Sequence, residues 1–511
     1  MKQTLTYITC LLLTSITLHS QSPTIINAKN GDVKVERMDI LNSPFRETNI
    51  SITPSARYLF FMTGRGGNEW SSENYTTFKD KPEFDGDIFM SEKIEGKWTK
   101  PKAIGTNINT MSGEDEPVIS QDGQKVYFQS WMGNWQGMGG PYYSSNLDGM
   151  HWRTKTPMGG GINQMFVDSS HKISATDGMT VSPDQQTFIV AAGHDYDGDL
   201  DLFISKKKDG EWSYLKKHPT STDKDERSVF LAADGKSLYF ASSGYGGKGG
   251  LDIFKAKLHD DGSIDEIVNL GAPFNTKHDD YGFIVAGNGY EAYFVRDGDI
   301  YHADLSKADP LIKPSKTIIL NGKVHDSNGK PAKAVVQIEM ADGTVVTTGT
   351  TNKITGEFSV SIPEPVKDLK IKITSGEDIK YYDLDLLAGD NEVIKDFIIE
   401  QNQPEHIILF EFDNHFITAK EKEKLNVFVS RMKLHPESII QLSGHTCSDG
   451  NHEYNVELSE NRAKRIYNQM VELGIPKHQI QVSFHGSKQP AETNSHASGK
   501  ESNRRVEISI K

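Results

Sequence analysis

Between about Asn49 and Leu305 the chain repeats one pattern of apolar and polar positions five times. Each copy begins with a short apolar strand, turns at polar residues, Pro or Gly, and returns as a strand in which aromatic residues alternate with others. The five copies are SITPSARYLFF, PVISQDGQKVYF, MTVSPDQQTFIV, VFLAADGKSLYF and GFIVAGNGYEAYF. This alternation around a turn predicts five antiparallel β-hairpins.

Two more strands are expected after each hairpin. A third strand is indicated by DGDIFMS, GPYYSSN, DLDLFIS, GLDIFKA and GDIYHAD, and an outer strand, often with Trp, follows in every copy but the last. The segment Val35–Asn49 resembles the outer strand of the fourth copy, so we expect it to complete the fifth and remove its open edge. Four short strands per repeat are typical of propeller blades, which bury both faces only by stacking on their neighbours. We predict a β-propeller of about five blades over residues 21–306.

The turns VSPDQ and SQDGQ of this segment resemble those of WD-type propeller repeats in bacterial envelope proteins. Asp87, Asp201, Asp252 and Asp299 stand at the same place in four copies, so we expect them to cap a turn. Asp195–Asp201 alternates carboxylates as a calcium loop does, but no Glu stands at the twelfth position. SNLDGMHW is similar to the Asp-box turns of sialidase propellers, yet its spacing differs and it occurs once. We predict no catalytic residue, no metal and no cofactor.

A linker rich in Pro and Lys near Lys307–Lys316 precedes a change of pattern. From residue 317 to residue 400, apolar residues alternate between Asn-Gly, Asp-Gly and Thr-Gly turns, which predicts a small antiparallel β-sandwich. This segment resembles the carboxypeptidase regulatory-like domain through GKVHDSNGKPAKAVVQI and TGEFSVSIP. The resemblance implies a spacer or an interaction module.

Residues 401–511 interleave helix and strand signals. The expected strands are ILFEFDNHF, SIIQLSGHT, QIQVSFHG and NRRVEISI. Thr418 and Glu421 offer a capping box for a first helix. A second helix is expected from about Glu453 to Leu473, where Gly474 ends it. Together these elements predict a compact α+β domain of the βαβαβ type.

Two polar residues interrupt the apolar face of the second helix. At 100° per residue, Asn455 and Arg462 fall close to the apolar stripe that contains Ile466. A guanidinium on that face must be paired, because an unpartnered buried charge costs several kcal/mol. Its partner is either a carboxylate of the same domain, such as Asp449 or Glu501, or a group of an external ligand.

The sequence around this helix carries a family resemblance. GHTCSDGNHEYNVELSENRAKRI at 444–466 and NRRVEI at 503–508 resemble the OmpA-like C-terminal domain, which binds peptidoglycan noncovalently. In that family an Asp of the turn meets the amine of the diaminopimelate residue in the stem peptide, and the helix Arg meets its carboxylate. The resemblance implies that Arg462 grips the carboxylate, for which its planar fork is suited. The supporting residues that it implies are Thr446, Asn455, Leu458, Asn503 and Arg504.

Cys447 departs from the family pattern, because it stands where the family has the Asp. A thiol has an ordinary pKa of about 8.5, so it is largely neutral at pH 7 and supplies no full charge to an ammonium. Asp449, two residues further on, is a candidate substitute and completes the predicted peptidoglycan site. The alternatives are weak binding, a different stem peptide, or a domain with only a structural role. We expect Cys447 itself to pack as a small hydrophobe.

The composition and charge of the chain exclude some classes of partner. The chain has 511 residues, with 56 Lys and Arg against 70 Asp and Glu, for a formal net charge of −14. This charge repels a phosphate backbone, so nucleic acid is not an expected partner. Residues 1–20 read as a cleaved signal peptide that contains Cys10, and no later segment is apolar for long enough to span a membrane as a helix. We expect a periplasmic, cell-wall-associated protein, with association to the outer membrane left open.

The predicted order of signal peptide, propeller, sandwich and OmpA-like domain indicates a non-enzymatic envelope adaptor. Its C-terminal end would attach to the diaminopimelate stem peptide of peptidoglycan, and its propeller would bind a protein partner that the sequence does not name. The arrangement resembles cell-wall-anchored accessory proteins of Bacteroidetes-type envelopes, some of which serve the type IX secretion machinery. The alternative is a propeller that binds or cleaves a glycan, tethered by the C-terminal domain.

Overall fold

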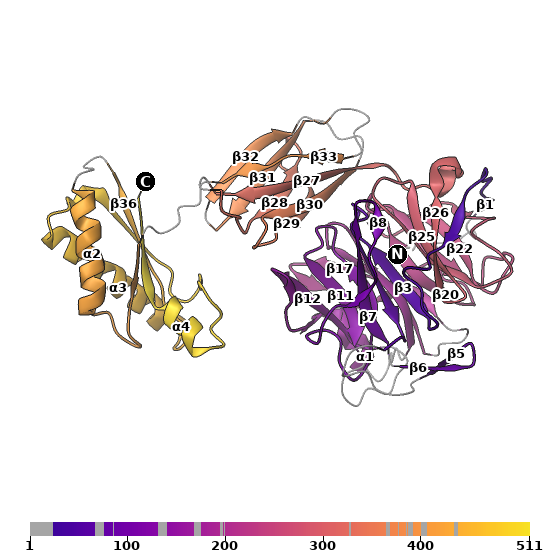
Figure 1. The fold of residues 1–511 in the computed structure, drawn as a ribbon, viewed down its shortest axis with the longest axis horizontal. Coiled ribbons are helices and arrows are strands. Elements are labelled where there is room, and N and C mark those ends of the chain that lie inside the picture. Colours follow the sequence, from indigo (N-terminus) through magenta and orange to yellow (C-terminus); the bar gives the residue numbers. More distant parts are fainter. Residues whose placement is uncertain are drawn as a thin grey trace, which may run out of the picture. The chain divides into compact units, whose positions relative to one another are not determined.

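The computed structural model describes residues 24–66, 76–84, 86–130, 140–167, 175–194, 198, 200–326, 329–363, 368–376, 378–384, 386, 392–399, 406–433 and 438–510. The chain divides into an N-terminal unit, residues 1–399, and a C-terminal unit, residues 400–511 (Figure 1). Strands predominate among the described elements, which confirms the mainly β fold class. Within these ranges no helix has the length and apolar character to cross a membrane. The predicted signal peptide and most of the calcium-like stretch lie outside the described residues.

The N-terminal unit begins with five small sheets of four or five strands each. The first contains β3 (Glu47–Ile52), β4 (Tyr58–Thr63), β7 (Asp87–Ile94), β8 (Lys97–Trp98) and β9 (Lys102–Ala103). The second contains β10 (Glu114–Ile119), β11 (Lys125–Ser130), β12 (Tyr142–Asp148), β13 (His151–Trp152) and β14 (Thr156–Pro157). The third contains β15 (Ala175–Val181), β16 (Thr187–Gly193), β17 (Asp201–Lys208), β18 (Glu211–Trp212) and β19 (Lys216–Lys217).

The fourth and fifth sheets each include one strand from the start of the described chain. The fourth contains β1 (Ile25–Asn27), β20 (Glu226–Leu231), β21 (Ser237–Ser242), β22 (Asp252–Lys257) and β23 (Ile267–Asn269). The fifth contains β2 (Val35–Arg37), β24 (Asp280–Val285), β25 (Glu291–Arg296) and β26 (Asp299–Asp304). A ribbon of β5 (Thr76–Phe78) and β6 (Lys81–Glu83), helix α1 (Gly161–Val167), and the 3-10 turns η1 (Leu305–Lys307) and η2 (Pro310–Ile312) complete this region.

All five hairpins that the sequence predicts are present, as the antiparallel pairs β3–β4, β10–β11, β15–β16, β20–β21 and β24–β25. The first strands of the sheets contact one another in a closed cycle, from β3 through β10, β15, β20 and β24 back to β3. Strand β2 pairs with β26 as the outer strand of the fifth sheet, where the sequence comparison placed it. The five sheets are called the five-sheet region below.

Each first strand carries a β-bulge at the same place. The residues in the left-handed backbone region at these bulges are Asn49, Glu116, Gly178, Ser228 and Gly282. A bulge inserts one residue and re-aims the neighbouring side chains. The five bulges together line a cavity of about 20 Å³, so the centre of the cycle is almost filled by side chains.

The repeated aspartates do not share one role. Asp252 caps its turn as predicted, because its Oδ2 accepts hydrogen bonds from the backbone of Lys248 at 2.7 Å and of Gly249 at 3.1 Å. Asp201 instead forms an ion pair with Lys217 at 2.6 Å, and Asp299 forms one with Arg37 at 2.9 Å. Capping is therefore too narrow a prediction for the repeat position.

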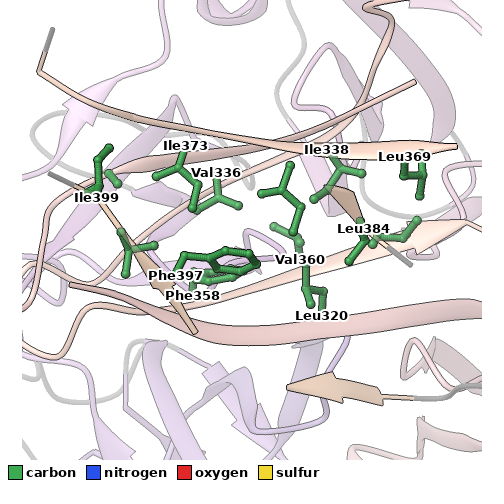
Figure 2. Packing of buried hydrophobic residues seen from close by; sticks show 14 of the residues in the cluster. Leu320, Val336, Ile338, Phe358, Val360, Leu369, Ile373, Leu384, Phe397 and Ile399 are labelled. Carbon is green, nitrogen blue, oxygen red and sulfur yellow. The ribbon is translucent and has the colours of Figure 1, made fainter. Parts of the chain in front are cut away.

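Residues 317–399 form two four-stranded sheets around one apolar core, shown in Figure 2. One sheet contains β27 (Thr317–His325), β30 (Glu357–Pro363), β33 (Glu392–Ile394) and β34 (Phe397–Ile398). The other contains β28 (Val335–Glu339), β29 (Val345–Thr350), β31 (Leu369–Ser375) and β32 (Asp378–Leu384). The prediction of a purely antiparallel sandwich is wrong in one respect, because β33 and β34 run parallel to β27. The chain crosses between the sheets before it returns, which is the condition for a parallel pair.

The C-terminal unit packs helices on one face of a four-stranded sheet. Its elements are β35 (His406–Leu409), α2 (Ala419–Met432), β36 (Ile440–Gly444), α3 (His452–Glu472), η3 (Lys477–Gln479), β37 (Ile480–Phe484), α4 (Ala497–Asn503) and β38 (Arg505–Ile510), with strand order β35-β38-β36-β37. Alternate strand residues such as Leu442 and Ile508 meet Phe428 of α2 and Ile466 of α3 in one buried core. This unit therefore has a core of its own.

The predicted first strand of this unit, ILFEFDNHF, ends earlier than expected. Strand β35 stops at Leu409, and the following residues leave the ladder. Their backbone carbonyls are then available to other donors, and two of them accept hydrogen bonds from Arg462. The capping prediction for α2 holds for Thr418, whose hydroxyl accepts from the Glu421 amide at 3.3 Å.

Candidate carboxylate-binding pocket

Arg462 lies on the buried face of α3, as the helix periodicity predicts, and 0% of its surface is exposed. Its Nε donates to the carbonyl of Asn414 at 2.8 Å, Nη1 to that of His445 at 3.0 Å, and Nη2 to that of Glu411 at 3.2 Å. The guanidinium also lies 5.3 Å from the centre of the Phe410 ring. Two segments of the unit, residues 410–414 and the turn at His445, are thus tied to one side chain of α3.

No carboxylate among the described residues forms an ion pair with this guanidinium, so of the two alternatives for its partner, the ion pair with Asp449 or Glu501 is not found. Burial lowers the pKa of Arg462 to about 10, which still leaves the group charged at neutral pH. A guanidinium has five N–H groups, and three of them donate to carbonyls. The arrangement leaves two N–H groups unused and the positive charge without an ion-pair partner among the described residues, although the charge of Asp413 in the same lining acts to raise the pKa of Arg462.

Arg462 lines a pocket with a volume of about 190 Å³. The other lining residues are Phe412, Asp413, Thr446, Cys447, Asp449, Gly450, Tyr454, Asn455, Leu458 and Arg504. Six of the seven sequence-predicted site residues therefore meet at one place, namely Thr446, Asp449, Asn455, Leu458, Arg462 and Arg504. Arg462 itself has no exposed surface, whereas Phe412 and Tyr454 of the same lining are 63% and 44% exposed.

Thr446 supplies a second unused group. Its hydroxyl is buried without a hydrogen-bond partner among the residues that the structure describes, while its backbone amide is held by the carbonyl of Gly486 at 2.9 Å. A buried hydroxyl without a partner is costly, and a ligand oxygen would satisfy it. Asn455, also buried, donates weakly to the Gly450 carbonyl at 3.4 Å and so braces the turn before α3.

The acid of the turn is already occupied. Asp449 Oδ1 pairs with Nζ of Lys500 from α4 at 2.6 Å, and Oδ2 lies 3.7 Å from the Cys447 Sγ. The hydrogen bond from Lys500 lowers the pKa of Asp449, so the carboxylate is ionised at neutral pH. Cys447 is buried, as expected of a small hydrophobe.

The two remaining predicted residues differ in their placement. Arg504 lines the pocket, half-buried, and its Nε donates to the Phe410 carbonyl at 3.1 Å. Asn503 is fully buried outside the pocket lining, where its amide bonds both backbone groups of Glu492 and the Asn494 side chain. Asn503 thus holds the loop that contacts the turn, since Asn494 also accepts from the Ser448 amide.

Sequence reasoning missed three groups at the pocket: Phe412, Asp413 and Tyr454. The first two were assigned to a strand that ends before them. The Tyr454 hydroxyl donates to Asp413, which joins the start of α3 to the segment after β35. The Asp413 carboxylate directly after an aromatic run was the available signal.

The neighbouring His445 adds no charge to the pocket. Its ring is buried and stacks on that of His485, with centroids 5.2 Å apart. Burial, and then the positive charge of Arg505, lower its pKa to about 3, so it is neutral at physiological pH. The positive charges at the pocket are therefore those of the arginines and of Lys500.

Comparison with known proteins finds a family match in the C-terminal unit. Residues 409–504 match the OmpA family. The matched segment thus begins at the last residue of β35 and ends just before β38, and it contains every residue that lines the pocket. The family resemblance expected from the sequence is confirmed for this C-terminal part.

Two curated proteins show the extent of the likeness. A peptidoglycan-associated lipoprotein of Legionella pneumophila is 32% identical over 102 residues, which are 20% of this chain and 58% of that protein. The probable lipoprotein YiaD of Escherichia coli is 30% identical over 125 residues, 24% of this chain and 52% of that protein. The chain spans about half the length of these two relatives.

Among solved structures, the crystal structure of the peptidoglycan-associated lipoprotein from Burkholderia pseudomallei is 23% identical, covers 21% of this chain and 91% of that one, and has a TM-score of 0.21. The N-terminal unit stands outside the family match.

Proposed function

We propose that the OmpA family domain attaches this protein noncovalently to the cell wall, by binding a carboxylate of a peptidoglycan stem peptide in the pocket around Arg462. One observation supports this most strongly. The guanidinium of Arg462 is buried, charged and, within the described chain, without an acidic partner. A buried charge is costly unless a counter-charge compensates it, and a carboxylate fits its planar fork.

The other pocket groups suit the same ligand. Arg504 adds a second positive charge, and the Thr446 hydroxyl has a free hydrogen-bonding capacity. Asn455 and Leu458 shape the wall from α3, and Asp449 stands at the opening of the turn. In this proposal Asn503 holds the loop behind the pocket and does not touch the ligand.

For the N-terminal unit, we propose that the five sheets are the blades of a propeller that binds a protein partner. The closed cycle of first strands supports this arrangement. The glycan-cleaving alternative requires room for a sugar between carboxylates, and the cavity lined by the bulges, about 20 Å³, has room for about one water molecule. We therefore propose a non-enzymatic periplasmic adaptor, fixed to the wall at one end.

Co-sedimentation of the full-length protein with purified sacculi tests the attachment. We expect Thr446→Val, which keeps the side-chain shape, to weaken binding about tenfold or more, because one hydrogen bond to a charged group is lost. Arg462→Gln should abolish it. Arg465→Gln, an exposed position on the same helix, is the matched control and should bind as the native protein does. If the native protein stays in the supernatant, or all four proteins pellet equally, attachment through this pocket is wrong.

A further inference from the structure

Both acids of the pocket are engaged by the protein itself. Asp449 is held by Lys500 and by the Cys447 thiol, one on each oxygen. Asp413 accepts a hydrogen bond from the Tyr454 hydroxyl. The guanidinium of Arg462 and the hydroxyl of Thr446, by contrast, have capacity left among the described residues. Asp413 keeps its charge and one oxygen, whereas the acid of the turn, Asp449, is already paired with a cation, so the turn offers no free acid to a ligand.

The charges around the pocket agree with this. Arg462, Arg504 and Lys500 carry three positive charges against the two negative charges of Asp413 and Asp449. A ligand ammonium near the turn would have to displace Lys500 from Asp449, and would meet its like charge after doing so. Replacing one ammonium by another gains little, because the ion pair that forms is matched by the one that breaks.

Resting on the proposed function, we propose that the pocket recognises a stem-peptide carboxylate without selecting for a charged amine beside it, and that Lys500, by pairing with Asp449, is the residue that removes this selectivity. An amine that has formed an amide bond to an adjacent stem is uncharged and needs no acid. The domain therefore binds cross-linked and uncross-linked stems with similar affinity. Lys500 acts through Asp449 and is a positioning residue, not a ligand-binding one.

The short helix α4, which carries Lys500, is held in place on both sides of this residue. Helix α4 is short, and Gly499 within it packs against the chain, since an added Cβ would lie 2.0 Å from the Thr493 carbonyl oxygen. Asn503 at its end is fully buried and fixed by three hydrogen bonds. The backbone on both sides of Lys500 is thus fixed, and its ammonium reaches the turn at Asp449.

Calorimetric titration of the full-length protein with two probes tests this assignment. One probe is a stem tripeptide that ends in diaminopimelate with a free side-chain amine, and the other is the same peptide with that amine acetylated. We expect the native protein to bind both within about twofold, since the acid of the turn is already paired with Lys500. Lys500→Met frees Asp449 and should favour the free amine by about fivefold. Lys500→Arg should restore the native ratio, and the exposed Lys488→Met should not change it.

The outcomes separate this inference from the proposed function. A native protein that prefers the free amine by about fivefold or more overturns the inference while leaving the attachment intact. Equal binding of both probes by Lys500→Met overturns the role of Lys500. Absence of binding to either probe overturns the proposed function and this inference with it.

Discussion

A single buried guanidinium organises the pocket. Arg462 gives three N–H groups to carbonyls of segments that lie 48, 17 and 51 residues away in sequence. Carbonyl dipoles solvate the charge in part, but they do not neutralise it, so the site keeps its attraction for an anion. The Cys447 and Lys500 side chains then determine whether a charged amine on the ligand adds to its affinity.

Cys447→Asp tests the role of the thiol. A second acid beside Asp449 is left over after Lys500 has paired, so affinity for the free-amine tripeptide should rise about fivefold or more. Cys447→Asn introduces a side chain of nearly the same shape as Asp but without its charge, and it should not raise the affinity for the peptide. Titration of both variants with the same peptide measures the difference; equal affinities would show that the missing charge at this position is irrelevant.

The sequence predicted some of the residues of the pocket. Periodicity placed Asn455 and Arg462 on the buried face of α3, because both interrupt an apolar stripe. It did not find Lys500, which lies on a seven-residue helix without apolar periodicity, ASGKESN. It also offered Asp449 and Glu501 as partners for Arg462, since spacing alone carries no information on which backbone carbonyls a strand end sets free.

At the scale of elements, α3 and the strand before the turn position the pocket together. Gly444 ends β36, and an added Cβ there would lie 2.1 Å from the Ser459 carbonyl oxygen of α3. The close approach brings Thr446 and Arg462 to one side of the domain. The sequence predicted the bounds of α3 to within about a residue from its Asn, Gly and apolar signals. It extended the first strand too far, because apolar alternation continues through Phe410 and Phe412 after the ladder has ended.

Gly444→Ala should therefore destabilise the C-terminal unit by about 1–3 kcal/mol, the usual cost of forcing extra volume into a packed interface. Urea unfolding followed by the signal of this unit measures the change. Gly159→Ala adds its methyl to open space in the N-terminal unit and is the control. A Gly444→Ala protein as stable as the native one would show that the strand and helix are not in close contact.

At the scale of the whole molecule, the two units have separate cores and separate sources of stability. Repeats in the sequence predicted the five hairpins of the five-sheet region, because the same alternation returns in each copy. They did not predict the bulges, whose left-handed residues are Asn, Glu, Gly, Ser and Gly and so leave no common sequence signal. One bulge residue, Glu116, is buried beside Asp115 and accepts hydrogen bonds from Gln129 and Tyr142.

Glu116 makes the stability of the N-terminal unit depend on pH. Burial, and then the charge of Asp115, raise its pKa to about 8, from an ordinary value of 4.5. The folded form therefore binds the proton more tightly than the unfolded form, so the free energy of unfolding falls as pH rises from about 4.5 to about 8. Glu116→Gln should reduce this fall by a few kcal/mol at most. Denaturant midpoints at pH 5, 6.5 and 8.5 measure it, with the exposed Glu266→Gln as control; parallel curves for native and Glu116→Gln proteins would contradict the account.

The central claim is that Arg462 takes its counter-charge from outside the protein. The most direct measurement compares the affinity of the full-length chain for a stem tripeptide with a free terminal carboxylate and for the same peptide with that carboxylate converted to an amide. The account predicts that the carboxylate peptide binds about tenfold tighter or more, because charge-assisted hydrogen bonds are the strong ones, and that Arg462→Gln removes the difference. Equal affinity of the native protein for the two peptides would contradict it.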